Sequence, residues 1–474
     1  MTDLCEADAI TLAGLLRRRE VSAREVVAAH IARAETVGGP VNAIVTATFD
    51  SALAKAAAAD EDLARGGAPG LLHGLPVAHK DLHDTAGVRT TYGSPLFAEH
   101  VPEVDDLVVQ RMAAAGAISL GKTNTPEFGA GSHTVNPVFG ATRNPYDLSR
   151  SAGGSSGGAA AALAARLICL ADGSDLGGSL RNPASFCNVV GFRPSPGRVP
   201  KWPFSEVAGV LGVSGPMGRT VADVALLLAV LAGPDPRVPF ALDAPLPALA
   251  SPAEVAGLLE RDVRGLRVGW SSDLGLPVEP AVRAALAPAR QVLMDLGCVV
   301  VDAAPDLSGA DEAFRIFRAN GFVQNYGELV RDHPGQVGPN VTWNVEEGRR
   351  LTIDDLRRAT ELQAAVAERV TEYFASVDVL ACPVSQVAPF DVELDWVREI
   401  NGRPQATYID WMASCYRITM TGLPAISVPA GFTPAGLPVG LQLVGARRSD
   451  WDLLGVARAF EAATGYGRVV PALP

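Results

Sequence analysis

Residues 152–159 read AGGSSGGA: two serines lie between two pairs of glycines, and a run of alanines follows. Glycine allows unusual backbone conformations, so the stretch has two interpretations, a flexible linker or a catalytic loop. The alanine run predicts a helix over 158–166, and the apolar residues 167–171 predict a buried strand. A loop fixed between two such regular elements is no spacer, and this favours the catalytic interpretation.

On both sides of this loop, short apolar strands alternate with helices along the whole chain. Such alternation predicts an α/β fold, with a mixed central β-sheet covered by helices on both faces. Strands are expected at 74–80, 117–121, 167–171, 265–270, 298–301, 377–381, 425–428 and 439–444. Helices are expected at 51–65, 105–115, 158–166, 221–232, 280–296, 312–329, 353–374 and 451–462, and after a capping box at 22–25.

The domain organisation follows from the same scan. No repeat or low-complexity linker divides the chain, so we predict a single domain over residues 1–474. Within it, 1–70 form an N-terminal helical region, 75–220 contain the main motifs, and the proline-rich segment 233–252 is a surface loop.

Composition excludes several classes of protein. The chain has 474 residues, 48% of them apolar, and a net charge of −12, which argues against nucleic-acid and anionic-membrane partners. No apolar run reaches the length of a membrane span, and the N-terminus has no signal-peptide pattern. Six scattered cysteines without metal-binding spacing indicate reduced thiols in a cytoplasmic protein with no metal site.

Two common motif assignments do not explain the glycine–serine loop. Residues 153–157 fit the G-x-S-x-G nucleophile elbow, but that motif needs a downstream acid and histidine, and only His333 follows. A phosphate-binding P-loop is weaker still, because no Gly-Lys-Ser/Thr follows the glycines.

A second glycine- and serine-containing cluster, DGSDLGGSLRNP over 172–183, is a candidate binding site for a negatively charged oxygen. Glycines there let backbone N–H groups converge on one point, as an oxyanion requires, although a simple turn has the same composition.

Lys80 ends a predicted buried strand and is one of only four lysines. Burial would lower its pKa and let it act as a base toward a serine, unless it forms an ion pair with Asp81.

Three segments together resemble the amidase signature family of Ser-cisSer-Lys amide hydrolases. They are GLPVAHKD at 74–81, SAGGSSGG at 151–158 and GSDLGGSLRNPASFCNVVG at 173–191. The resemblance covers the chain from Leu75 onward. It implies an amidase-signature domain that needs neither cofactor nor metal.

By this resemblance Ser179 is the nucleophile, and Ser155 relays its proton to Lys80. The peptide bond between Gly154 and Ser155 is expected to be cis. The implied oxyanion hole consists of the backbone N–H groups of Leu176, Gly177, Gly178 and Ser179. The residues expected to line the substrate site are Gly129, Ala130, Gly131, Ser132 and Trp202, with further candidates in 202–204, 314–326 and 411–416.

The remaining polar residues near these motifs are assigned supporting roles. Asp175 and Arg181 are expected to pair and stiffen the second cluster. The others are expected to pack rather than react: His79, His83, Lys122, Ser156 and Cys187.

Three functions fit these residues. The main prediction is a free-standing, cytoplasmic amidase for small aliphatic or aryl amides, with no nucleic-acid or membrane partner and an architecture compatible with a homodimer. The alternative is the glutaminase subunit of a tRNA-dependent amidotransferase. In those relatives a Ser-Leu-Asp-Gln-Ile-Gly-Pro run stands where 210–216 here read VLGVSGP, and this difference disfavours the alternative. A non-catalytic binding protein is the third, disfavoured because the whole triad is present.

Overall fold

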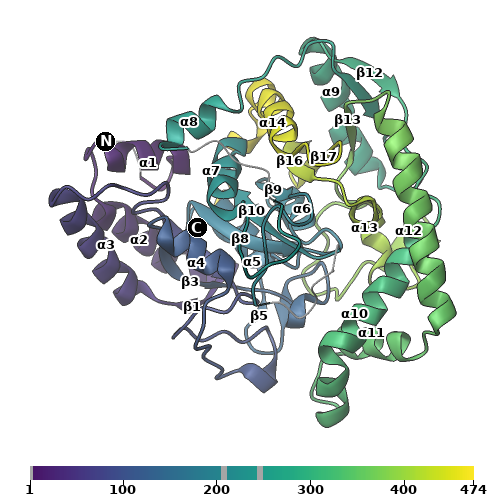
Figure 1. Ribbon diagram of the computed structural model, residues 1–474, viewed down its shortest axis with the longest axis horizontal. Coiled ribbons are helices and arrows are strands. Elements are labelled where there is room, and N and C mark those ends of the chain that lie inside the picture. The colour runs from purple at the N-terminus through teal and green to yellow at the C-terminus, as the bar shows by residue number, and fades with distance from the viewer. Residues whose placement is uncertain (1–3, 204–210, 243–248, 474) are drawn as a thin grey trace.

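The computed structural model describes residues 4–203, 211–242 and 249–473. Its main feature is one mixed sheet that runs through the middle of the molecule (Figure 1). In spatial order the strands are β1 (Ile44–Ala47), β3 (Ile118–Thr123), β2 (Pro76–Lys80), β8 (Leu170–Asp175), β10 (Val213–Gly218), β9 (Val190–Arg193), β16 (Ala425–Phe432), β17 (Pro438–Gly445), β13 (Val379–Pro383), β11 (Arg267–Trp270) and β12 (Val299–Asp302).

The sheet combines parallel and antiparallel pairs. β2 runs parallel to both β3 and β8, whereas β10 is antiparallel to β8, and β16 is antiparallel to β17. Parallel neighbours end at the same edge of a sheet. The carboxyl ends of β2 and β8, which carry Lys80 and Asp175, therefore lie side by side.

Helices flank this sheet, as the α/β prediction requires. α5 and α6 contact each other and several central strands, and α7, α14 and α9 form a second connected group that contacts many of the same strands. The helices are α1 (Ala9–Arg17), α2 (Ala23–Val41), α3 (Phe49–Ala64), α4 (Leu107–Ala114), α5 (Gly157–Ala164), α6 (Arg181–Phe186), α7 (Val221–Leu231), α8 (Pro252–Gly257), α9 (Pro280–Asp295), α10 (Ala310–Asp332), α11 (Pro339–Arg349), α12 (Ile353–Phe374), α13 (Ala413–Thr421) and α14 (Asp450–Thr464).

Short elements complete the described chain. The two-stranded pairs are β4 (Val135–Asn136) with β5 (Gly140–Ala141), β6 (Arg143–Asn144) with β7 (Asp147–Ser151), and β14 (Glu399–Ile400) with β15 (Arg403–Pro404). Single 3₁₀ turns occur at Pro95–Phe97, Glu127–Gly129, Asp410–Met412 and Tyr466–Arg468.

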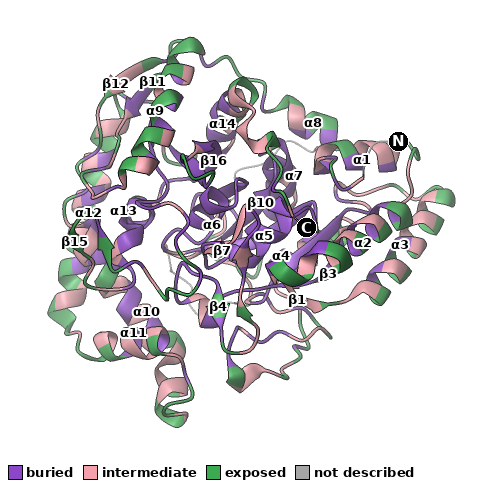
Figure 2. Cartoon of the chain, turned by 180° about the vertical axis from the view of Figure 1, so that it is seen from behind, coloured by how far each residue is buried: buried purple, intermediate pink, exposed green. Residues whose placement is uncertain are grey.

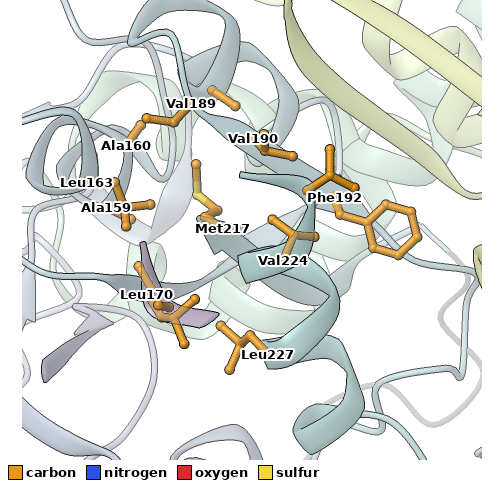
Figure 3. Close-up of a cluster of buried hydrophobic side chains, with 14 of the residues drawn as sticks. Ala159, Ala160, Leu163, Leu170, Val189, Val190, Phe192, Met217, Val224 and Leu227 are labelled. Atoms are coloured by element: carbon orange, nitrogen blue, oxygen red, sulfur yellow. The ribbon is translucent and has the colours of Figure 1, made fainter. Parts of the chain in front are cut away.

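The core is centred on α5, which contains only glycine, alanine and leucine and is buried along its whole length. A helix that is apolar on every side belongs inside a protein. Figure 3 shows Ala159 and Leu163 of α5 near Leu170 of β8, with Val224 of α7 in the same cluster. Buried residues concentrate in this central region, whereas α3 and α12 carry exposed faces (Figure 2).

Several sequence predictions need adjustment. The strand expected at 167–171 begins at Leu170 and continues to Asp175. β10 was not predicted, because its sequence, VSGPMG, contains a proline and two glycines that usually interrupt strands. The capping box at 22–25 is confirmed: Ser22 accepts from the backbone of Glu25, and Glu25 accepts from Ser22.

The domain boundaries remain predictions. In the segment 233–252, residues 243–248 lie outside the described residues, and α8 already begins at Pro252. No helix in the described ranges is long and apolar enough to cross a membrane.

Candidate active site

Lys80 lies at the end of β2 and is fully buried. Its ammonium nitrogen donates to three hydroxyls: Ser155 Oγ at 2.7 Å, Ser156 Oγ at 2.9 Å and Ser174 Oγ at 3.1 Å. The structure thus brings together Lys80 and Ser155, which lie 75 positions apart in the sequence. Ser174 was missed, since nothing in its sequence context marks it as a partner of lysine.

Burial is the main electrostatic influence on this lysine. Loss of hydration lowers the pKa of Lys80 to about 7, even though the carboxylates of Asp175 and Asp172 act in the opposite direction. A lysine with that pKa is partly neutral near pH 7, and a neutral amine can accept a proton.

This pKa predicts how catalysis depends on pH. If neutral Lys80 is the working base, kcat/KM falls about tenfold per pH unit below about pH 7 and levels off above it, because protonation removes the lone pair. Initial rates between pH 5 and 9 on an amide substrate test this. A profile that stays flat down to pH 5 would contradict the assignment of Lys80 as the base.

The glycines of the 152–159 loop are needed for close packing. The bond between Gly154 and Ser155 is cis, as the resemblance implied. A Cβ on Gly154 would lie 3.0 Å from the backbone nitrogen of His133, and one on Gly158 would overlap the backbone nitrogen of Asn124. The loop is therefore wedged against its neighbours, and the linker interpretation is wrong.

Ser179 lies between β8 and α6, adjacent to this loop. The N–H of Ser156 donates to the Ser179 carbonyl at 3.1 Å, so the two serine-containing segments are joined through their backbones. Ser179 is only 9% exposed. A Cβ on Gly129 would lie 3.5 Å from Ser155 Oγ, which places this predicted lining residue beside the triad.

The backbone around Ser179 forms the candidate oxyanion site. Gly178 has φ +116, a conformation that favours glycine, and its N–H donates to Asp175 Oδ1 at 3.0 Å. That N–H group is therefore already engaged. The N–H groups of Gly177 and Ser179 make no hydrogen bond within the described ranges.

The carboxylate of Asp175 holds this backbone in place through hydrogen bonds. Its carboxylate accepts from Arg181 Nη2 at 2.9 Å, from Arg193 Nη1 at 3.3 Å and from the N–H of Leu180 at 3.2 Å. Burial alone would raise the pKa of Asp175, but the two guanidinium groups hold it well below its usual range. The predicted pairing of Asp175 with Arg181 is thus present, and Arg193 is a partner that sequence reasoning missed.

A second buried carboxylate, Asp172, organises the residues next to Lys80. It accepts from Nδ1 of His79 at 2.5 Å, from Nδ1 of His83 at 2.7 Å and from the N–H of Lys80 at 2.9 Å. Burial acts to raise the pKa of Asp172, yet the two imidazoles lower it strongly. Lys122 donates to the His83 carbonyl, away from the serines. These contacts agree with packing roles for the histidines and Lys122.

Residues after position 310 in the sequence contact the predicted lining residues and the turn before Ser179, and together they form one wall of the candidate site. Ser132, a predicted lining residue, donates to Met412 Sδ at 2.8 Å, and Ala130 accepts from Asn340 on α11 at 3.0 Å. A Cβ on Gly177 would lie 3.1 Å from Phe314 Cζ, and the Phe314 ring stacks on Tyr416 at 4.4 Å.

Two other predicted lining residues lie in different surroundings. A Cβ on Gly131 would lie 3.6 Å from the Asn340 amide nitrogen, next to the wall. Trp202 has its ring 4.0 Å from the guanidinium of Arg237, which gives it a partner outside the triad, and its contact with substrate stays a prediction. Phe204, in the same predicted segment, lies outside the described residues.

Comparison with known proteins shows which protein family the chain belongs to. The family model named Amidase matches residues 25–454. A solved bacterial aryl acylamidase of the amidase signature family superimposes with a TM-score of 0.90 at 30% identity, over 99% of both chains. The chain belongs to the amidase signature family and is a hydrolase that acts on carbon–nitrogen amide bonds.

The curated relatives share one name. The chain is 38% identical to a glutamyl-tRNA(Gln) amidotransferase subunit of Moorella thermoacetica, over 98% of this chain and 97% of that protein. Other curated relatives at 34–36% identity carry the same name. The solved structure of the corresponding amidotransferase subunit from Thermotoga maritima has a TM-score of 0.81 at 27% identity, over 100% of this chain and 99% of that one.

These relatives correct two predictions. The free-standing amidase was the wrong choice, since near-full-length relatives are named as an amidotransferase subunit. The expectation of a small-molecule partner without nucleic acid is wrong for the same reason. The difference at 210–216 is confined to seven residues and does not outweigh the similarity along the whole chain.

Proposed function

We propose that this chain is the amide-cleaving subunit of a glutamyl-tRNA(Gln) amidotransferase and releases ammonia from the side-chain amide of glutamine. The observation that carries the proposal is 38% identity over 98% of the chain to such a subunit. The buried arrangement of Lys80 with Ser155 supports it chemically, because that pair provides a base for amide cleavage.

The first chemical step is acylation. Ser179 Oγ attacks the amide carbon while its proton passes to Ser155, and the Ser155 proton passes to neutral Lys80. A neutral lysine has two N–H groups and one lone pair, which match its three hydroxyl partners. The lone pair accepts from Ser155, and the N–H groups donate to Ser156 and Ser174.

The intermediate then collapses to products. Its oxyanion binds the N–H groups of Gly177 and Ser179, while Gly178, with its N–H on Asp175, fixes the shape of the turn. The relay returns one proton to the leaving nitrogen, and ammonia departs from the acyl-enzyme. Water, deprotonated by the same relay, attacks the ester and yields glutamate and free Ser179.

The acceptor of the ammonia is the second substrate of the assembled enzyme. The name of the relatives includes glutamyl-tRNA(Gln), so we assign the glutamyl group of that tRNA as the acceptor. Cys169, Cys187, Cys298, Cys382 and Cys415 are buried free thiols, in keeping with a reducing, cytoplasmic location.

The test has two parts. Ammonia release from glutamine is measured for the purified chain alone and after co-expression with the other subunits encoded in the same genome, with a Ser179→Ala preparation as the blank. Conversion of glutamyl-tRNA(Gln) to glutaminyl-tRNA(Gln) is then followed in the assembled enzyme. If assembly yields neither glutamine-derived ammonia nor amidated tRNA, the proposed function is wrong.

A further inference from the structure

Arg315 and Arg318 lie on α10 and Arg417 contacts it, and these three arginines differ in how their charge is balanced. Arg315 donates to Asp410 at 2.7 Å, and Arg417 donates to Asp311 at 2.6 Å. Arg318 is 5% exposed, and no carboxylate of the described chain lies within ion-pair distance of it. It therefore carries a buried charge that the described protein does not neutralise.

The groups around Arg318 are neutral. Its Nε donates to Asn344 Oδ1 at 3.1 Å and its Nη2 to Tyr408 Oη at 2.7 Å, while the guanidinium lies 4.7 Å from the centre of the Phe322 ring. Within the described ranges, Nη1 makes no hydrogen bond, and it is not sealed off from solvent as fully buried atoms are. The Nη1 side of the Arg318 guanidinium can therefore donate to a further acceptor.

The position of Arg318 relates it to the active site. Phe314, Arg318 and Phe322 are spaced at i, i+4 and i+8, so they share one face of α10. Phe314 approaches Gly177 of the oxyanion turn, and Phe322 belongs to the same apolar cluster as Ala130 of the lining loop. Arg318 thus lies between the two segments that border Ser155 and Ser179.

Hydrogen bonds fix this placement. Asn344, which accepts from Arg318, donates through its amide to the carbonyl of Asn340 at 2.7 Å, and Asn340 donates to the Ala130 carbonyl at 3.0 Å. Only two residues therefore separate the guanidinium from the lining loop. Figure 1 shows α10 and α11 together at one end of the molecule, with α13 next to α10.

We propose that Arg318 is a specificity-determining residue that binds a carboxylate of the substrate, several bonds away from the amide that is cleaved. The inference rests on the proposed function, in which the carboxylate is the α-carboxylate of glutamine. A buried guanidinium attracts an anion strongly, because neutral hydrogen-bond acceptors leave its charge uncompensated. Arginine also matches the planar, two-oxygen shape of a carboxylate.

The test compares matched amides on the purified protein, or on the assembled enzyme if only that is active. The substrates are glutamine, glutaramate and butanamide, which is glutaramate without its carboxylate. Wild type is expected to prefer glutaramate over butanamide. Arg318→Gln should raise KM for glutamine and glutaramate roughly 10- to 100-fold, the range expected for a lost charged hydrogen bond, and leave butanamide within about twofold.

Control variants separate specificity from structure. Arg318→Lys keeps the charge and should recover part of the preference for carboxylates, whereas Arg315→Gln, which removes a paired arginine, should not alter the ratio of the two rates. Equal losses on glutaramate and butanamide in Arg318→Gln would overturn the proposal. A wild type that prefers butanamide would overturn it without any variant.

The outcomes also distinguish this inference from the proposed function. Hydrolysis of glutaramate but not glutamine, with the expected effect of Arg318→Gln, would remove the amidotransferase assignment and keep the carboxylate site. Hydrolysis of glutamine that is indifferent to Arg318→Gln would keep the assignment and remove the site.

Discussion

Replacing Lys80 by alanine is expected to lower kcat by about 1,000-fold, the scale of a lost general acid–base. The reason is geometric as well as electrostatic. Lys80 is the only described amine within hydrogen-bond distance of Ser155, and burial gives it the pKa of a usable base. Arginine at this position should not restore activity, since a guanidinium stays protonated.

The measurement is single-turnover and steady-state hydrolysis of one amide by wild type, Lys80→Ala and Lys80→Arg. Circular dichroism and thermal melting establish that each variant is folded. Lys55→Arg serves as the matched control, because Lys55 is exposed on α3 and should retain full activity. An active Lys80→Arg enzyme would show that the lysine acts as a fixed charge and not as a base.

Replacing Asp175 by alanine is expected to reduce the free energy of unfolding by roughly 3–5 kcal/mol, the range for breaking a buried ion pair. Asp175, Arg181 and Arg193 are all fully buried, so the remaining charges cannot be hydrated without disturbing the fold. Gly178 and Leu180 would also lose the acceptor of their N–H groups. Activity should fall with stability, since these residues shape the oxyanion turn.

Urea unfolding at pH 7 measures this effect. The pKa of Asp175 is depressed in the folded protein, so its contribution is fully present above about pH 4, the usual range of an aspartate, and is lost only as the pH falls toward the folded value. Asp262→Ala is the control: its partner Arg264 is exposed, and such surface pairs contribute little. Equal unfolding midpoints for Asp175→Ala and wild type would refute the structural role.

The candidate catalytic residues could be named from the sequence because each lies in a short motif, and their roles stay predictions. Lys80, Ser155 and Ser179 sit in motifs whose order and spacing are typical of the family, and the structure brings Lys80, at the end of β2, within 2.7 Å of Ser155 Oγ. The alanine-rich helix α5 was equally clear, since no polar residue interrupts it. The α/β class followed from alternation alone.

Other features depended on contacts that no local pattern records. The candidate segments 314–326 and 411–416 include Phe314 and Tyr416, but the sequence did not indicate which of their side chains approach Gly177. The engagement of the Gly178 N–H by Asp175 is visible only in three dimensions. The choice between a free-standing hydrolase and an amidotransferase component failed because one short motif says little about partners.

The placement of the site residues along the chain has one more consequence. The candidate catalytic residues lie between residues 80 and 179, as do the predicted lining residues 129–132, whereas α10, α11 and the segment before α13, which contact this stretch, lie more than 130 residues later. Changes in the later stretch can therefore alter the surroundings of the lining loop while Lys80, Ser155 and Ser179 stay unchanged.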